Sequence, residues 1–248
     1  MKKLKGLRTG LFLIGLFAVA LTSCSTATPE VSTIVDVPMQ EENITIVDED
    51  SITDVDPVAL DHAFSGNTTT DLSDVEADGL SYMREEEKLA RDVYMMLYEQ
   101  WGIQIFNNIA KAEETHMSAV ADLLDRYGLP DPAADMAVGV FTNPELQALY
   151  DQLPEEGSQS LADALRVGAL VEEVDIIDLE TYIAQTENED VLLVYRNLLK
   201  GSQNHLRAFT STLERQTGDL PASAFRLDGV DWILGTGIKR VPESIFTT

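Results

Sequence analysis

Residues 112–120 of the chain read AEETHMSAV, and they place Glu113 and His116 three positions apart. In a helix this spacing puts two side chains one above the other on the same face. The apolar residues Ile109 and Val120 recur at helical spacing on that face. A Glu-x-x-His spacing is common by chance, so its meaning depends on what surrounds it. Here the neighbouring residues predict that both polar side chains point into the core of a helical protein.

Three more segments with an apolar period near 3.6 accompany this one. No convincing run of alternating apolar and polar residues, typical of strands, appears from residue 78 onward. The segments expected to be helical are residues 80–100, 106–127, 160–185 and 190–215, with a shorter helix at 144–153. Four amphipathic helices bury their apolar faces most simply against one another. The sequence therefore predicts an all-α four-helix bundle over residues 78–215.

Polar residues also fall on the core-facing stripes of the other predicted helices. The third helix carries Glu172 and Asp175 on its stripe, and the fourth carries His205. On the first helix Glu87 fits the stripe best, with Glu86 as the alternative. The interior of the bundle is therefore expected to hold four carboxylates and two imidazoles.

Other charged residues in these segments have a simpler interpretation. Glu114 and Glu173 fall off the stripes and are expected at the surface. Glu85 and Glu86 can also be explained as acids that favour the N-terminus of a helix. The basic residues of the first helix are expected mostly outside its stripe: Arg84, Lys88 and Arg91.

The inward-pointing acids require compensation. Burying one carboxylate without a partner costs several kcal/mol, and several of them together repel one another. Because the nearby basic residues are expected outside the stripe, a bound metal is the most economical compensator. Carboxylate oxygen and imidazole nitrogen without thiolate favour iron or manganese, with zinc possible. The predicted ligands are Glu87, Glu113, His116, Glu172, Asp175 and His205.

Four longer strings carry a resemblance to known proteins: MREEEKLARDVY, FNNIAKAEETHMSAVADLLDRYGLPDP, VGALVEEVDIIDLE and NLLKGSQNHLRAF. Across about residues 78–215 the chain resembles the ferritin-like di-iron carboxylate bundles. It resembles more closely the ferritin-like family catalogued as domain of unknown function 2202. The resemblance implies two iron ions held at the six positions named above. It assigns Glu87 to the first helix and His205 to the histidine of the fourth.

One position departs from the pattern of the superfamily. Ser202 stands three residues before His205, where the pattern has a glutamate. Three consequences remain open: Asp175 or Glu172 bridges the metals instead, the second metal is weak or absent, or the site has been repurposed.

The N-terminus has the layout of a secretory signal. Residues 1–23 combine a basic start with an apolar run from Leu11 to Leu21. That run is shorter than the roughly 20 apolar residues that a membrane span needs. It ends in LTSC, which resembles a bacterial lipobox and implies cleavage before Cys24 and attachment of lipid to it. We therefore expect a lipid-anchored protein of the bacterial cell envelope, on its periplasmic or extracellular face.

The regions that flank the predicted bundle lack helical periodicity. Residues 24–77, which include His62, are expected to form a mostly disordered acidic tether, and residues 216–248 an irregular tail. Removing residues 1–23 takes away four of the 17 basic residues and none of the 43 acidic ones, which leaves about 30 net negative charges. This balance argues against partners that need a basic patch, such as nucleic acid.

Three functions are compatible with these features. The favoured one is a metal-dependent redox role of oxidase or ferroxidase type, in which two irons react with oxygen or peroxide. Tyr94 could then supply a hydrogen bond or an electron, although packing alone also explains it. The second is a lipoprotein that binds or senses a divalent metal without catalysis, which Ser202 favours slightly. The third is a structural remnant that holds no metal.

Overall fold

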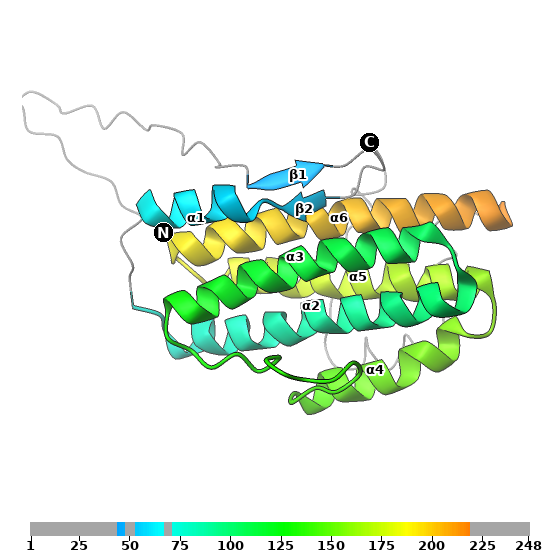
Figure 1. Cartoon of the computed structure of the whole chain (residues 1–248), viewed down its shortest axis with the longest axis horizontal. Helices are drawn as coiled ribbons and strands as arrows, with labels where there is room; N and C mark the ends of the chain where they lie inside the picture. Colours follow the sequence, from blue (N-terminus) through cyan, green and yellow to red (C-terminus); the bar gives the residue numbers. More distant parts are fainter. Residues whose placement is uncertain (1–43, 48–52, 67–70, 219–248) are drawn as a thin grey trace, which may run out of the picture. The chain divides into compact units, whose positions relative to one another are not determined.

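Four long helices make up most of the chain that the structure describes, which is residues 44–47, 53–66 and 71–218 (Figure 1). The structure is a computed structural model, and it confirms the predicted all-α bundle. The bundle helices are α2 (Asp74–Trp101), α3 (Gln104–Arg126), α5 (Leu161–Ile183) and α6 (Glu189–Thr217). The remaining elements are β1 (Thr45–Val47), β2 (Thr53–Val55), α1 (Pro57–Gly66) and α4 (Pro144–Gly157).

Local capping explains where the bundle helices begin and end. Helix α2 begins six residues before the predicted position 80, because Ser73 and Glu76 form a capping box in which each satisfies the other's backbone N–H. It ends at Gly102, whose left-handed φ of 66° glycine adopts without strain. Only two residues then separate α2 from α3, so the two helices form an antiparallel hairpin.

Two apolar clusters fill the bundle. One, the Phe209 cluster, contains residues of all four helices, including Leu97 and Phe106, and the other, the Leu80 cluster, contains Leu123. Along both α3 and α5 the chain passes from the Phe209 cluster to the Leu80 cluster, so these two helices run in the same direction. The connection between them therefore returns along the bundle, and its helix α4 packs against α2 and α5.

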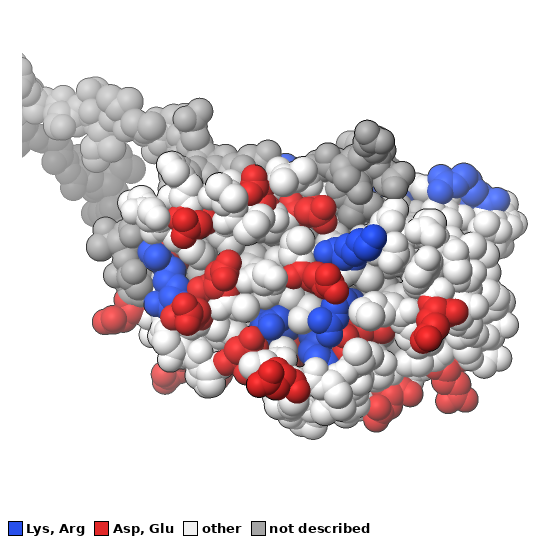
Figure 2. Space-filling model, in the orientation of Figure 1, with Lys and Arg blue, Asp and Glu red and all other residues white. Residues whose placement is uncertain are grey.

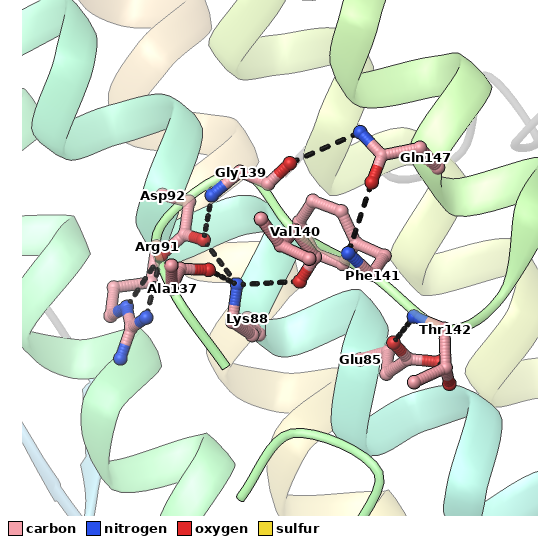
Figure 3. A network of polar contacts seen from close by, with 10 residues as sticks. All are labelled: Glu85, Lys88, Arg91, Asp92, Ala137, Gly139, Val140, Phe141, Thr142 and Gln147. Atoms are coloured by element: carbon pink, nitrogen blue, oxygen red, sulfur yellow. Dashed lines mark hydrogen bonds and ion pairs between the residues drawn. The ribbon is translucent and has the colours of Figure 1, made fainter. Parts of the chain in front are cut away.

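A buried lysine on α2 holds this connection in place (Figure 3). Lys88 is 1% exposed, and its ammonium lies 2.6 Å from a carboxylate oxygen of Asp92. It also donates to the carbonyls of Ala137 and Val140, at 2.9 and 3.2 Å, and lies 4.3 Å from the ring centre of Phe141. The prediction that Lys88 lies outside the core-facing stripe was therefore wrong.

Glu85 is fixed to the same connection. Its carboxylate accepts hydrogen bonds from the backbone N–H and the hydroxyl of Thr142 and from the N–H of Asn143. The interpretation of Glu85 as an acid at a helix N-terminus was wrong, because α2 begins at Asp74 and Glu85 is only 3% exposed.

Part of the predicted tether is folded. Strands β1 and β2 pair antiparallel, and the N–H of Val55 donates to the Thr115 hydroxyl of α3 at 3.0 Å. Helix α1 follows, with the Asp56 carboxylate capping its first N–H groups, and it buries Phe64 in the Leu80 cluster. The expectation of disorder was wrong for these elements, which include His62 as an exposed residue of α1.

The other predictions for the flanking regions concern residues that the structure does not describe. The signal, Cys24, the rest of the tether before residue 44 and the tail after residue 218 all fall there. Among the described residues, no helix combines the length and the apolar composition that crossing a membrane requires.

Charged side chains of both signs are interspersed on the face seen in Figure 2. Two ion pairs connect different parts of the fold. Arg84 meets Asp131 of the α3–α4 connection at 2.9 Å, and Arg126 of α3 meets Asp190 of α6 at 2.7 Å. These pairs are partly exposed, so water and salt screen them more than the buried pair of Lys88.

Replacing this lysine tests its role in the fold. We expect Lys88→Met to lower the free energy of unfolding by about 3 kcal/mol, because Asp92 loses one of its two cations and two carbonyls lose their donor. Urea unfolding measures the change. The matched control is Lys111→Met, which removes an exposed ammonium from α3 and should change stability by less than about 0.5 kcal/mol. Equal effects of both substitutions would contradict the assignment.

Candidate metal centre

A polar layer separates the two apolar clusters at the middle of the bundle. It contains all six residues that the sequence predicts as ligands, and each of them is at most 4% exposed. Helix α2 supplies one acid, α3 supplies an acid and a histidine, α5 supplies two acids, and α6 supplies the second histidine. The six side chains are Glu87, Glu113, His116, Glu172, Asp175 and His205. In contrast, Glu114 is exposed, as the sequence predicts.

Glu113 lies at the centre of this layer, between the two imidazoles. One of its carboxylate oxygens lies 2.9 Å from Nδ1 of His205, and the other lies 2.9 Å from Nδ1 of His116. The two rings are stacked, with centroids 5.4 Å apart. One ligand atom from each of these three residues lies within 4.8 Å of the other two, a spacing that suits a single metal ion.

Two more carboxylates approach the imidazoles from the side. Glu87 Oε2 lies 3.3 Å from Nδ1 of His116, and Glu172 Oε2 lies 3.6 Å from Nδ1 of His205. The same nitrogen of each ring thus faces two carboxylates that come from different helices. The first-helix assignment of Glu87 agrees with this geometry, because Glu87 is the α2 acid that contacts His116.

Several buried atoms of the layer lack a hydrogen-bond partner among the described residues. They are Oε1 of Glu87 and of Glu113, Oδ1 of Asp175, Nε2 of His116 and both ring nitrogens of His205. His205 Nδ1 and Glu113 Oε1 are close enough for a hydrogen bond, but their geometry does not form one. Unpaired buried polar atoms cost about 1–3 kcal/mol each, and a cation between them would satisfy several at once. The residues present therefore fit a metal.

The layer has an unusual balance of charge. Burial raises the pKa of Glu87 to about 8, with Glu113 adding to the shift and His116 opposing it. Burial and the charge of Glu113 raise the pKa of Glu172 to about 7. Burial also opposes ionisation of Glu113, but His205 and His116 together hold its pKa below the usual range.

For the two histidines, burial and the neighbouring charges again act in opposite directions on the pKa. Burial would lower their pKa values, but the neighbouring carboxylates outweigh it and raise the pKa of His205 to about 9 and that of His116 well above its ordinary value. The layer therefore holds protons at neutral pH when no other cation balances its acids. A metal that binds through these nitrogens would displace those protons.

Two small residues of α6 shape the layer around the imidazoles. A Cβ atom on Gly201 would lie 2.7 Å from Cε1 and Nε2 of His116, so only glycine leaves room for this ring. The hydroxyl of Ser202 donates to the carbonyl of Leu198 at 3.0 Å and contacts Asp175. Asp175 thus brings a carboxylate from α5 next to Ser202 of α6.

Tyr94 supports the layer from the Phe209 cluster. Its hydroxyl donates to Glu172 Oε1 at 2.7 Å, and its ring packs against Phe209 with centroids 5.1 Å apart. Tyr94 therefore both packs in the core and orients a carboxylate of the layer, so the two interpretations of this residue are compatible.

Glu86, the alternative to Glu87 on the predicted stripe, is buried as well. It is 3% exposed and faces Asp178 of α5, while Glu87 faces His116. The interpretation of Glu86 as an acid that favours a helix N-terminus was wrong. Its burial next to buried Glu85 and Glu87 shows that three consecutive acids of α2 point into protein, each toward a different neighbour.

Comparison with known proteins assigns the chain to a family. Residues 76–235 match the family described as an uncharacterized protein domain, DUF2202. The chain belongs to the DUF2202 family. A curated relative of this DUF2202 protein, uncharacterized protein MJ0754 of Methanocaldococcus jannaschii, is 55% identical over 169 residues, which are 68% of this chain and 91% of the relative.

A solved structure agrees with the fold of this DUF2202 chain. The crystal structure of hypothetical protein MJ0754 from Methanococcus jannaschii superimposes with a TM-score of 0.61 at 46% sequence identity. The match covers 70% of this chain and 99% of the other. The helical bundle is therefore shared with a protein known from experiment.

Crowding one imidazole tests how tightly the layer is built. We expect Gly201→Ala to weaken metal binding at least about tenfold, because the added methyl group must displace the ring of His116. Competition titration with Co(II) or Zn(II) measures the affinity. The control is Gly79→Ala, whose methyl group would crowd the ring of Tyr182 and leave the histidines untouched. An unchanged affinity in a folded Gly201→Ala protein would show that His116 is not a ligand.

Proposed function

We propose that this protein is a metal-binding bundle of the ferritin-like di-iron carboxylate type with a redox role. The observation that carries the proposal is the position of Glu113, whose two oxygens each lie 2.9 Å from an imidazole nitrogen in a fully buried layer. Each helix of the bundle contributes to this layer, as in the carboxylate bundles whose ligands project inward from four helices.

The topology supports the same type of protein. Helices α3 and α5 run in the same direction and are joined by a connection that returns along the bundle. Ferritin-like bundles contain one long crossover of this kind. The arrangement differs from bundles in which all neighbouring helices alternate in direction through short loops.

The donor set indicates which ions the protein would hold. Oxygen and imidazole ligands without sulfur suit iron or manganese, with zinc possible. The residues that would hold two ions are Glu87, Glu113, His116, Glu172, Asp175 and His205. Bound iron would supply one-electron chemistry with oxygen or peroxide.

The protein itself would orient the ligands and limit access of water. Tyr94 fixes one oxygen of Glu172 through its 2.7 Å hydrogen bond, which keeps the carboxylate directed at His205. The apolar clusters on both sides keep the layer dry, and this strengthens every electrostatic interaction inside it.

Metal binding without turnover is the second candidate function. It is favoured by Ser202, whose hydroxyl donates to the carbonyl of Leu198 and so does not replace the missing glutamate as a ligand. With one carboxylate fewer on α6, one of two ions would be held less firmly. Such a protein would bind or sense a divalent metal.

Metal loading of the purified protein tests the proposal. After anaerobic incubation with Fe(II), Mn(II) or Zn(II) and removal of free ions, we expect the protein to retain metal by elemental analysis. Glu113→Gln and His205→Gln should lose it, because each removes a central donor. Glu114→Gln, the exposed neighbour, should bind like the natural protein. Oxygen uptake on adding Fe(II) then separates the two functions, since a binder consumes none above the rate without protein. A natural protein that retains no metal contradicts both.

We also propose that lipid on Cys24 anchors the protein to the bacterial cell envelope. The support is the basic start, the apolar run and the LTSC string of residues 1–24. In a bacterial host, the natural protein should fractionate with membranes and incorporate labelled palmitate. Cys24→Ala should lose the label, because the chain has no other cysteine. A membrane-bound, unlabelled natural protein would contradict lipidation.

A further inference from the structure

Glu86 is buried beside the metal centre and faces another acid, Asp178. It is 3% exposed, and no hydrogen-bond donor among the described residues reaches either of its oxygens. The mechanism proposed above makes no use of it, because the neighbouring Glu87 is the residue directed at His116. A buried carboxylate in this state needs a proton or a cation beside it.

The groups around Glu86 are themselves acidic. Its carboxyl lies within hydrogen-bonding range of the carboxyl of Asp178, one helical turn after Asp175 on α5. Asp178 is partly exposed and accepts a hydrogen bond from the Tyr82 hydroxyl at 3.1 Å. Asp175 is fully buried and has an unpartnered oxygen, Oδ1. Three carboxylates thus lead from the partly exposed side of α5 to the central layer.

The basic residues of α2 are engaged elsewhere and do not compensate this group. Arg84 pairs with Asp131, and both Lys88 and Arg91 pair with Asp92. The adjacent Glu85 shows what a satisfied carboxylate on this helix looks like, because its oxygens accept three hydrogen bonds from the α3–α4 connection. Glu86 accepts no such hydrogen bonds from the described residues, although it is buried to the same extent as Glu85.

We propose that Glu86 and Asp178 form an outer site for a divalent cation, from which Asp175 passes the ion to the centre at Glu113, His116 and His205. Two facing carboxylates, of which Glu86 has both oxygens unpartnered among the described residues, suit hard or borderline cations such as Mn(II), which favour oxygen ligands. The partly exposed Asp178 gives the ion contact with water, and the buried Asp175 borders both sites. The route to the centre rests on the proposed function, whereas binding at the outer site does not.

Equilibrium binding of Mn(II) to the full-length protein tests the outer site. We expect the natural protein to bind one ion more than either Glu86→Gln or Asp178→Asn. This additional ion should bind more weakly than the ions at the centre. The control Glu180→Gln removes an exposed carboxylate from the same helix and should leave the number of ions unchanged. Asp178→Asn is included in case Glu86→Gln misfolds. Its side chain is partly exposed and the substitution is nearly isosteric, so this variant should fold. Equal numbers of ions in all four proteins would overturn the proposal.

Loading kinetics with Co(II) test the route to the centre. Co(II) bound through the histidines absorbs visible light, so stopped-flow absorbance follows its arrival there. We expect Glu86→Gln and Asp178→Asn to reach the natural final absorbance at least about tenfold more slowly. Unchanged rates would overturn the route. If the natural protein shows no Co(II) spectrum, the central site fails and with it the proposed function, while the Mn(II) count still decides the outer site.

Discussion

A carboxylate in the middle of a helical bundle has lost most of its hydration, and four of them share one layer of this protein. The two imidazoles of that layer carry at most two positive charges, so they cannot balance four ionised carboxylates, and the layer retains protons unless a cation binds. Each feature around it can be understood as a response to this constraint. Gly201 admits one imidazole, Tyr94 fixes one carboxylate, and Ser202 contacts another, Asp175.

The same bundle also contains acids that it neutralises by itself. Asp92 receives Lys88, Arg91 and the N–H of Gly139, and Glu85 receives the donors of residues 142 and 143. The fold can therefore supply donors to a buried carboxylate at the α3–α4 connection. In the layer around Glu113, by contrast, several buried oxygens and ring nitrogens have no hydrogen-bond partner among the described residues, and this is the reason to infer a cation there.

Helical periodicity was enough to predict most of the fold. The apolar stripes identified four helices to within a few residues, and the polar residues on them turned out to be the buried ones. Periodicity could not reveal α1, because its ten residues follow a short hairpin rather than a long amphipathic segment. A local signal was present, since Asp56 before Pro57 is a typical start of a helix.

The acids of α2 show where pattern reasoning fails. Glu85, Glu86 and Glu87 are consecutive and lie about 100° apart around the helix, so a single stripe includes at most two of them, yet all three are buried. The reason is tertiary: α2 is covered on different sides by α3, by α5 and by the connection with α4. A helix surrounded in this way has several interior faces, and its sequence alone does not say which neighbour each face meets.

The division of the core into the Phe209 and Leu80 clusters has a consequence for how the protein unfolds. Between them the helices are continuous, but the side chains that meet in the layer are polar, so it contributes less apolar burial than the two clusters do. Without a cation, the halves should open as separate cooperative units with different amide exchange rates. A metal bound by four helices would join them, and the chain would then exchange as a single unit. Metal binding at the centre would therefore change the amide exchange rates along the whole length of the bundle.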